Sequence, residues 1–133
     1  MSEYTSTLEG FQRSMEWGLT GPPEESYLYA ESTTMPTFYQ IINGQRLAYD
    51  AFVKHVMEWR VRVSEFRPVV DEFLRDGDRL AAHTTGTMTV DGVGNSFESF
   101  IFAKVDKESG KMEWMIERSV WGRTGEEPEH GVN

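Results

Sequence analysis

The chain contains no cysteine and only three histidines, His55, His83 and His130. The absence of cysteine excludes disulfides, thiolate metal ligands and thiol nucleophiles. The histidines are far apart in the sequence, and none belongs to a metal-binding spacing such as His-Glu-x-x-His. The short DGD and DGVG segments of the chain are typical of hairpin turns rather than of phosphate-binding loops. We therefore expect no metal site and no bound cofactor.

Basic residues are also scarce, with 13 Lys and Arg against 22 Asp and Glu and a net charge of −9. This excess of acid repels phosphate backbones and anionic lipid surfaces, so we expect no nucleic-acid partner and no membrane partner. The chain has no apolar run of about 18 residues, and its first residues lack the basic and apolar segments of a signal peptide. These absences favour a cytoplasmic protein.

Apolar residues make up 38% of the 133 residues and aromatic residues 13%, which is enough for one hydrophobic core. We expect a single domain over residues 1–122. Residues 123–133 carry three glutamates and a proline without apolar periodicity, and this composition predicts a flexible acidic tail.

The first half of the chain shows mainly helical patterns. Apolar residues at helical spacing predict a helix over 5–19, and the proline and acids at 23–25 favour a short helix over 26–31. Strand-forming residues over 37–42 precede an Asn43-Gly44 turn. Helical spacing then resumes from about residue 46 and predicts the longest helix.

The second half consists of strand and turn patterns. After Pro68 we expect four strands joined by hairpins, with turns near Gly77, Gly92 and Gly110. Helices followed by antiparallel strands are typical of an α+β domain. The prediction is a curved, mostly antiparallel sheet wrapped around about three N-terminal helices, forming a cone with an internal pocket.

This order of elements resembles the nuclear-transport-factor-2-like superfamily and, within it, the SnoaL-like proteins, over roughly residues 5–122. The resemblance rests on four segments: YAESTTMPTFYQIING, AFVKHVMEWR, FLRDGDRLAAHTTGTM and SFIFAKVDKESGKMEWMIERSVWG. It implies cofactor-free cyclisation, isomerisation, dehydration or rearrangement of a polyketide or terpenoid-type metabolite. It also implies a homodimer, because many members pair through the outer face of the sheet.

Glu117 is the first candidate for catalysis. Strand alternation places it on one face of the last strand with Met115 and Ser119. A carboxylate among apolar neighbours is costly unless it is hydrogen-bonded or used, and burial raises its pKa. The SnoaL-like resemblance implies an acid–base carboxylate at this position. The alternative is an exposed ion pair with Arg118 or Lys104.

Tyr39 is the second candidate, with Thr37 beside it. Ketosteroid-isomerase-like members carry an aspartate base in this segment, and here it holds no carboxylate. That departure argues against their enolising mechanism and leaves Tyr39 and Thr37 as hydrogen-bonding groups. The alternative is that Tyr39 is an ordinary strand aromatic.

Further residues complete the expected substrate site, which would hold a hydrophobic small molecule: Thr37, Trp59, Thr84, Glu98, Met115 and Ser119. Simple alternation groups Glu98 with Phe100 and Phe102, and only a bulge would turn it toward the pocket. Alternation also directs His83 away from the pocket with Ala81, Thr85 and Thr87, a face poor in charge that we expect to form the dimer. We expect His55 to be solvated.

The sequence leaves two functions open. One is a cofactor-free acid–base enzyme of isomerase, cyclase or dehydratase type acting on a hydrophobic small molecule. The other is a non-catalytic module of the same fold that binds a small molecule or dimerises. An enclosed cavity that contains Glu117 would favour the enzyme.

Overall fold

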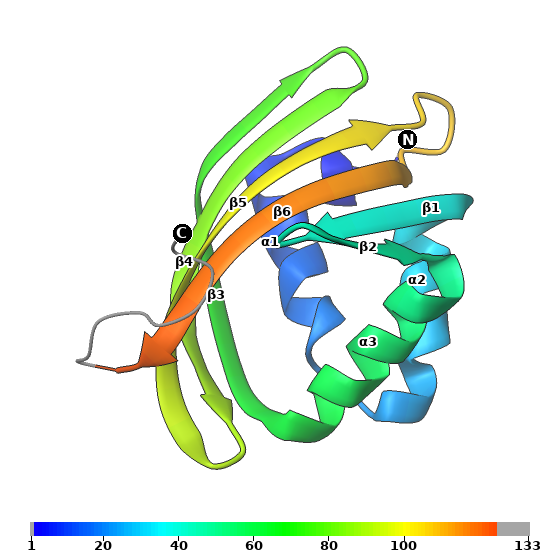
Figure 1. Cartoon of the computed structure of the whole chain (residues 1–133). Coiled ribbons are helices and arrows are strands. Elements are labelled where there is room, and N and C mark those ends of the chain that lie inside the picture. The colour runs from blue at the N-terminus through cyan, green and yellow to red at the C-terminus, as the bar shows by residue number, and fades with distance from the viewer. Residues whose placement is uncertain (1, 125–133) are drawn as a thin grey trace.

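A curved six-stranded sheet surrounds three α-helices in the computed structural model, which describes residues 2–124 (Figure 1). The helices α1, α2 and α3 lie on the concave side of the sheet. The elements in chain order are η1 (Glu3–Thr5), α1 (Leu8–Gly18), η2 (Pro23–Glu25), α2 (Ser26–Thr33), β1 (Thr34–Ile42), β2 (Gln45–Ala48), α3 (Tyr49–Arg62), β3 (Val63–Asp76), β4 (Arg79–Val90), β5 (Val93–Val105) and β6 (Met112–Arg123).

The strand order is β2-β1-β6-β5-β4-β3, and every neighbouring pair is antiparallel except β1 with β6. The parallel pair arises because the chain crosses from β1 to the far end of the sheet and returns through three hairpins. This arrangement confirms the predicted α+β class and the mostly antiparallel sheet. The three predicted hairpin turns also lie where the sequence indicated.

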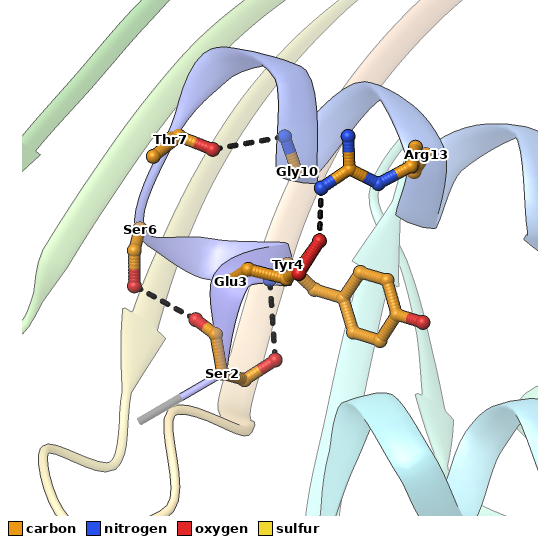
Figure 2. A network of polar contacts seen from close by, with 7 residues as sticks. All are labelled: Ser2, Glu3, Tyr4, Ser6, Thr7, Gly10 and Arg13. Carbon is orange, nitrogen blue, oxygen red and sulfur yellow. Dashed lines mark hydrogen bonds and ion pairs between the residues drawn. The ribbon is translucent and has the colours of Figure 1, made fainter.

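The first helix begins at Leu8 rather than at residue 5. Thr7 is its N-cap, and the Thr7 hydroxyl accepts a hydrogen bond of 2.9 Å from the backbone N–H of Gly10 (Figure 2). Such a cap satisfies one of the free N–H groups of the first turn. Residues before the cap form the separate turn η1, which Ser2 caps in the same way and which the Arg13–Glu3 ion pair ties to α1.

The long helix starts at Tyr49, and the prediction that it begins near residue 46 was wrong. Asn43 and Gly44 both have positive φ, 48° and 86°, which is the geometry of a tight hairpin turn. Residues 45–48 therefore pair antiparallel with β1 as the short strand β2. A four-residue strand leaves too little alternation for its pattern to be detected.

Strand β3 starts at Val63, directly after α3, and not after Pro68 as predicted. Pro68 is tolerated inside β3 because β3 is the outermost strand of the sheet. On the open side of such a strand, the N–H group that proline lacks would have no neighbouring strand to bond to. Arg123 belongs to β6, Thr124 forms the turn that follows it, and residues 125–133 of the predicted tail lie outside the described residues.

Two clusters of apolar side chains fill the concave side of the sheet. The larger one includes Phe11, Phe38, Phe52 and Leu80, and it packs α1, α2 and α3 onto the sheet. The smaller one, around Val63, collects aromatic rings near the junction of α3 with β3; its members are Val63, Met88, Val90, Leu19, Trp59, Phe66, Phe97 and Trp121. No helix between residues 2 and 124 has the length and apolar character needed to cross a membrane.

Candidate active site

A cavity of about 380 Å³ lies between the two apolar clusters, bounded by the concave face of the sheet and by α1, α2 and α3. Its size is at the lower end of the range of small-molecule sites. Its lining is mostly apolar and aromatic: Met15, Gly18, Leu19, Tyr29, Gln40, Ile42, Asn43, Gln45, Phe52, His55, Val56, Trp59, Phe66, Met88, Phe97, Ser99, Met115, Glu117, Ser119 and Trp121.

Strand β6 contributes the acidic group. Alternation along an extended strand turns Met115, Glu117, Ser119 and Trp121 to the same face, and all four line the cavity. Ile116 and Arg118 are exposed on the convex side. Glu117 is opposite Ile101 on β5 and opposite Ile42 on β1, so its carboxyl group stands among central strands.

Both carboxylate oxygens of Glu117 accept hydrogen bonds from uncharged side chains. Gln40 Nε2 donates to Oε1 at 3.1 Å, and Ser119 Oγ donates to Oε2 at 2.7 Å. Ser99 Oγ lies 2.6 Å from Ser119 Oγ. Because the only hydrogen of the Ser119 hydroxyl is committed to Glu117, Ser99 is the donor in that pair.

Burial raises the pKa of Glu117 above its ordinary value near 4.5, and the nearby hydroxyl groups of Ser119 and Ser99 and the amide of Gln40 oppose the rise. Within residues 2–124 no Lys or Arg forms an ion pair with Glu117. Lys104 instead lies 3.8 Å from Glu113. The structure therefore does not contain the exposed ion pair that was the alternative role for Glu117.

The other ionisable groups of the cavity are uncharged at neutral pH. Burial raises the pKa of Tyr29 to about 12 and lowers the pKa of His55 below 6.5. His55 thus lines the cavity and packs edge-on to Trp59, whereas we expected it to be solvated. No Lys or Arg is among the described residues that line the cavity. The described part of the cavity lining therefore offers no charged group that could neutralise an anionic ligand.

Gln40 is the polar residue of the site that the sequence analysis missed. It lies on β1, its residue is 6% exposed, and it lines the cavity beside Met115 and Glu117. Its amide oxygen Oε1 is buried and accepts no hydrogen bond from any described residue. Leaving a buried acceptor without a donor costs about 1–3 kcal/mol, so this atom needs an explanation.

Tyr39 and Thr37 do not share a cavity with Glu117, contrary to expectation. On β1 the side chains of Phe38 and Gln40 point inward, so the residues between and beside them face the other way. Tyr39 and Thr37 line a separate surface hollow near β2, where the Arg46 guanidinium stacks 3.7 Å above the Tyr39 ring. Tyr39 is thus a strand aromatic outside the cavity.

Glu98 also lies outside the cavity. No bulge interrupts β5 at this position, and alternation carries Glu98 to the convex face with Phe100 and Phe102. There it is 2.6 Å from His83 Nε2, and Asp71 is 2.6 Å from His83 Nδ1. These two carboxylates raise the pKa of His83 above 6.5. His83 points away from the cavity, as the alternation predicted.

The remaining expected site residues have different placements. Trp59, Met115 and Ser119 line the cavity. Thr84 is fully buried on β4 opposite Ser99, its cross-strand partner on β5, and is not part of the cavity wall. In the described part of the chain, no three side chains of His, Asp or Glu are arranged to hold a metal ion.

Comparison with known proteins gives structural relatives only. No protein-family model matches the chain. No curated protein sequence matches it either.

Three solved structures illustrate the structural likeness. BvnE pinacolase from Penicillium brevicompactum is 9% identical, with a TM-score of 0.70 over 88% of this chain and 82% of that one. A proposed polyketide cyclase from Bacillus cereus ATCC 10987 is 18% identical, with a TM-score of 0.64 over 82% and 70%. An LEH-like epoxide hydrolase from M. tuberculosis is 15% identical, with a TM-score of 0.60 over 80% and 79%.

Another matching structure is described as a nuclear-transport-factor-2-like protein, and a further one carries NTF2 in its name. The chain therefore has the nuclear-transport-factor-2-like fold, and the resemblance stated from the sequence is confirmed at that level. Identities this low establish the fold and leave the activity to be argued from the site.

Proposed function

We propose that this protein is a cofactor-free acid–base enzyme of isomerase, cyclase or dehydratase type, with Glu117 as the proton-transferring group. The observation that carries the proposal is the half-buried Glu117 carboxyl group in the wall of an aromatic cavity, to which the described residues donate hydrogen bonds from neutral side chains only. A carboxyl group desolvated in this way binds its proton more tightly than in water. It can therefore exchange that proton with a substrate closer to neutral pH.

The cavity also indicates the kind of substrate. Its lining offers aromatic and apolar surface, one acid and no cation among the described residues, so an uncharged hydrophobic molecule fits it best. The structural neighbours include a pinacolase, a proposed polyketide cyclase and an epoxide hydrolase, which act on small organic molecules. We therefore propose a polyketide or terpenoid-type metabolite, as in secondary metabolism.

The decisive experiment compares the wild type with Glu117→Gln on a panel of uncharged polycyclic hydroxyketones and epoxides. Liquid chromatography with mass detection separates isomerisation or cyclisation, which keeps the mass, from dehydration, which loses water. Gln keeps the shape of the side chain and one acceptor oxygen but cannot transfer a proton. We expect turnover to fall by about 10²–10⁴-fold with the fold intact.

Glu113→Gln is the matched control, because Glu113 lies on the same strand and pairs with Lys104 outside the cavity. It should leave turnover unchanged. A Glu117→Gln variant that retains full turnover on a substrate of the panel would show that Glu117 is not the proton-transferring group.

The second candidate is a binding or dimerisation module, and the convex face of the sheet favours it. This face carries exposed apolar side chains that a freely solvated sheet would not need: Val69, Leu74, Phe100, Phe102 and Ile116. They surround the bridge that His83 makes with Asp71 and Glu98. We propose that two copies pair through these faces, in addition to the reaction in the cavity.

A further inference from the structure

His55 is an ionisable group of the cavity wall that the proposed reaction does not yet use. It lies on α3 with Phe52, Val56 and Trp59, and all four side chains line the cavity. Residues three, four and seven positions apart share one face of a helix, so the period of α3 turns His55 toward the cavity. Because His55 also keeps part of its surface accessible, a ligand in the cavity can contact its imidazole.

The imidazole of His55 has no polar partner among residues 2–124. Burial lowers its pKa, and the charge of Glu58 on the same helix opposes the lowering, but no hydrogen bond contributes. His83 differs, since a carboxylate lies 2.6 Å from each of its ring nitrogens. A neutral imidazole has one N–H donor and one bare nitrogen that accepts a proton. His55 therefore presents an uncommitted base to the cavity.

His55 and Glu117 belong to different walls of the same cavity. Glu117 lies on β6 in the middle of the sheet, and His55 lies on α3, which packs on the concave side (Figure 1). No hydrogen bond joins the two side chains, and neither is among the groups that shift the pKa of the other. The two groups thus stand apart, and a ligand that fills the cavity can contact both at once.

Burial acts on these two groups in opposite directions. It raises the pKa of Glu117 and lowers that of His55, because in each case it disfavours the charged form. The ordinary values of 4.5 and 6.5 would give a carboxylate and an imidazolium ion between them. Both shifts instead favour a protonated carboxyl group together with a neutral imidazole. In that form the cavity offers one acid and one base to the same ligand.

We propose that His55 is the base of a two-group site, which removes a proton from a carbon atom of the substrate while Glu117 protonates an oxygen atom of the same molecule. Such a substrate is a carbonyl compound with an acidic C–H bond beside the carbonyl group. This inference rests on the proposed function, adds a second proton-transferring residue to it and narrows its substrate class.

A β-hydroxy ketone shows how the step balances. The C–H electron pair forms the C=C bond, the C–O bond breaks, and the hydroxyl group leaves as water with the proton of Glu117. His55 gains the proton that the carbon atom loses. Transfer of that proton from the imidazolium ion to the Glu117 carboxylate through solvent restores the site.

The experiment uses 5-nitrobenzisoxazole, an uncharged aromatic carbon acid that opens when a base removes its ring C–H proton next to nitrogen. The C–H electron pair forms a nitrile, the N–O bond breaks, and the coloured nitrophenolate leaves without an acid. We expect the wild type to open this probe and His55→Gln to be slower by about 10²–10⁴-fold. Glu117→Gln should change the rate far less, because the probe needs only the base.

Met57→Gln is the matched control, because Met57 lies on the same helix, is exposed and does not line the cavity. It should leave the rate unchanged. In the wild type the rate should rise with pH through the pKa of His55, measured by NMR of the imidazole, and then level off. Glu58→Gln removes the charge that raises this pKa, so the kinetic inflection and the NMR value should move to lower pH together.

Three results would overturn the inference. The first is a wild type that opens the probe no faster than buffer does, and the second is a His55→Gln variant that keeps the wild-type rate. The third is a rate lost in Glu117→Gln and kept in His55→Gln, which would make Glu117 the base. If His55→Gln does not fold, Glu58→Gln decides, since a kinetic inflection that stays while the imidazole pKa moves also overturns it.

Failure of the proposed function gives a different result. Glu117→Gln would then keep full turnover of the hydroxyketones, while His55→Gln would still lose turnover of 5-nitrobenzisoxazole. That combination would refute Glu117 as the acid and support His55 as a base of the cavity.

Discussion

The Ser119 hydroxyl donates a hydrogen bond of 2.7 Å to Glu117 Oε2, two residues earlier on the same face of β6. Ser99 on β5 donates in turn to Ser119 at 2.6 Å, so a line of two hydroxyl groups ends at the carboxylate. Such donors stabilise the ionised form of Glu117 against the desolvation that surrounds it. The pKa of Glu117 thus depends on the pairing of β5 with β6, which brings Ser99 to Ser119, as well as on the carboxyl group itself.

Ser119→Ala should raise the pKa of Glu117 further, because it removes a donor that favours the ionised form while burial remains. Titration of the Glu117 carboxyl carbon by ¹³C NMR measures the shift. Ser96→Ala is a suitable control, since Ser96 is an exposed serine on β5 outside the cavity. A pKa of Glu117 that is unchanged or lower in Ser119→Ala would contradict this account of the hydroxyl line.

Glu117 should also make the stability of the fold depend on pH. Its pKa in the folded state lies above its ordinary value near 4.5, so the folded state binds the proton more tightly than the unfolded state. Its contribution to stability is complete below pH 4.5 and is lost as the pH rises through the folded pKa. Each unit of pKa difference corresponds to about 1.4 kcal/mol.

Glu117→Gln removes the contribution of Glu117 to the pH dependence of stability. The contribution of His83, whose raised pKa acts in the same direction at higher pH, remains in both proteins. Urea unfolding of both proteins from pH 4 to pH 8 gives the comparison, over the range set by these pKa values. We expect the free energy of unfolding of the wild type to fall relative to the variant as the pH rises. A difference that is constant with pH would show that the pKa of Glu117 is not raised.

Arg60 should be important for stability although it lies outside the cavity. Its residue is 6% exposed, and its guanidinium donates to the backbone oxygens of Trp17 at 2.7 Å, Pro22 at 3.0 Å and Gly18 at 3.1 Å. Arg60→Met leaves these carbonyl groups without their donor and should lower the free energy of unfolding by about 2–4 kcal/mol.

Arg62→Met is the control for this prediction, because the Arg62 side chain makes exposed contacts with Asp91 and the ring of Trp59. It should cost less than about 1 kcal/mol. Equal losses in the two variants, measured by urea unfolding, would show that the carbonyl contacts of Arg60 are not what stabilises the end of α1.

The proposed dimer is tested by sedimentation velocity at micromolar concentration. The wild type should sediment as two chains of 15.3 kDa each. Phe102→Glu places a charge in the centre of the exposed apolar face and should give monomers, and His83→Glu should weaken the dimer by adding a third carboxylate beside Asp71 and Glu98.

Val61→Glu is the matched control for the dimer, since Val61 is 73% exposed on α3, away from the convex face. It should leave the dimer intact. A wild type that sediments only as a 15.3 kDa species would refute pairing through the sheet.

The placement of Glu117 follows from the sequence because it depends on one local rule. Alternate residues of a strand share a face, and Met115, Glu117 and Ser119 follow that rule along a strand without a break after Trp114. The same rule directs His83 to the convex face. Long strands with clear alternation therefore permit a correct assignment of faces before the fold is known.

Which residues of β1 face inward could not be predicted from strand alternation in the sequence. Tyr39 and Gln40 are adjacent, and hydrophobicity favours the tyrosine as the buried residue, yet the amide is buried and the tyrosine faces outward. The pairing of β1 with β6 decides this by placing Gln40 opposite Met115 and next to Glu117. A shift of one residue in that register would exchange the two faces.

The sequence by itself determined the α+β class, the hairpins of the second half and the position of Glu117, because these depend on turn residues and on the period of a strand. Only the tertiary structure decided which polar groups meet that carboxyl group. Gln40 lies 77 residues before Glu117 in the sequence, and Ser99 lies 18 residues before it. Sheet pairing alone brings Gln40 within hydrogen-bond reach of Glu117, and Ser99 within reach of Ser119. Contacts between distant segments depend on register and packing, which local patterns do not encode.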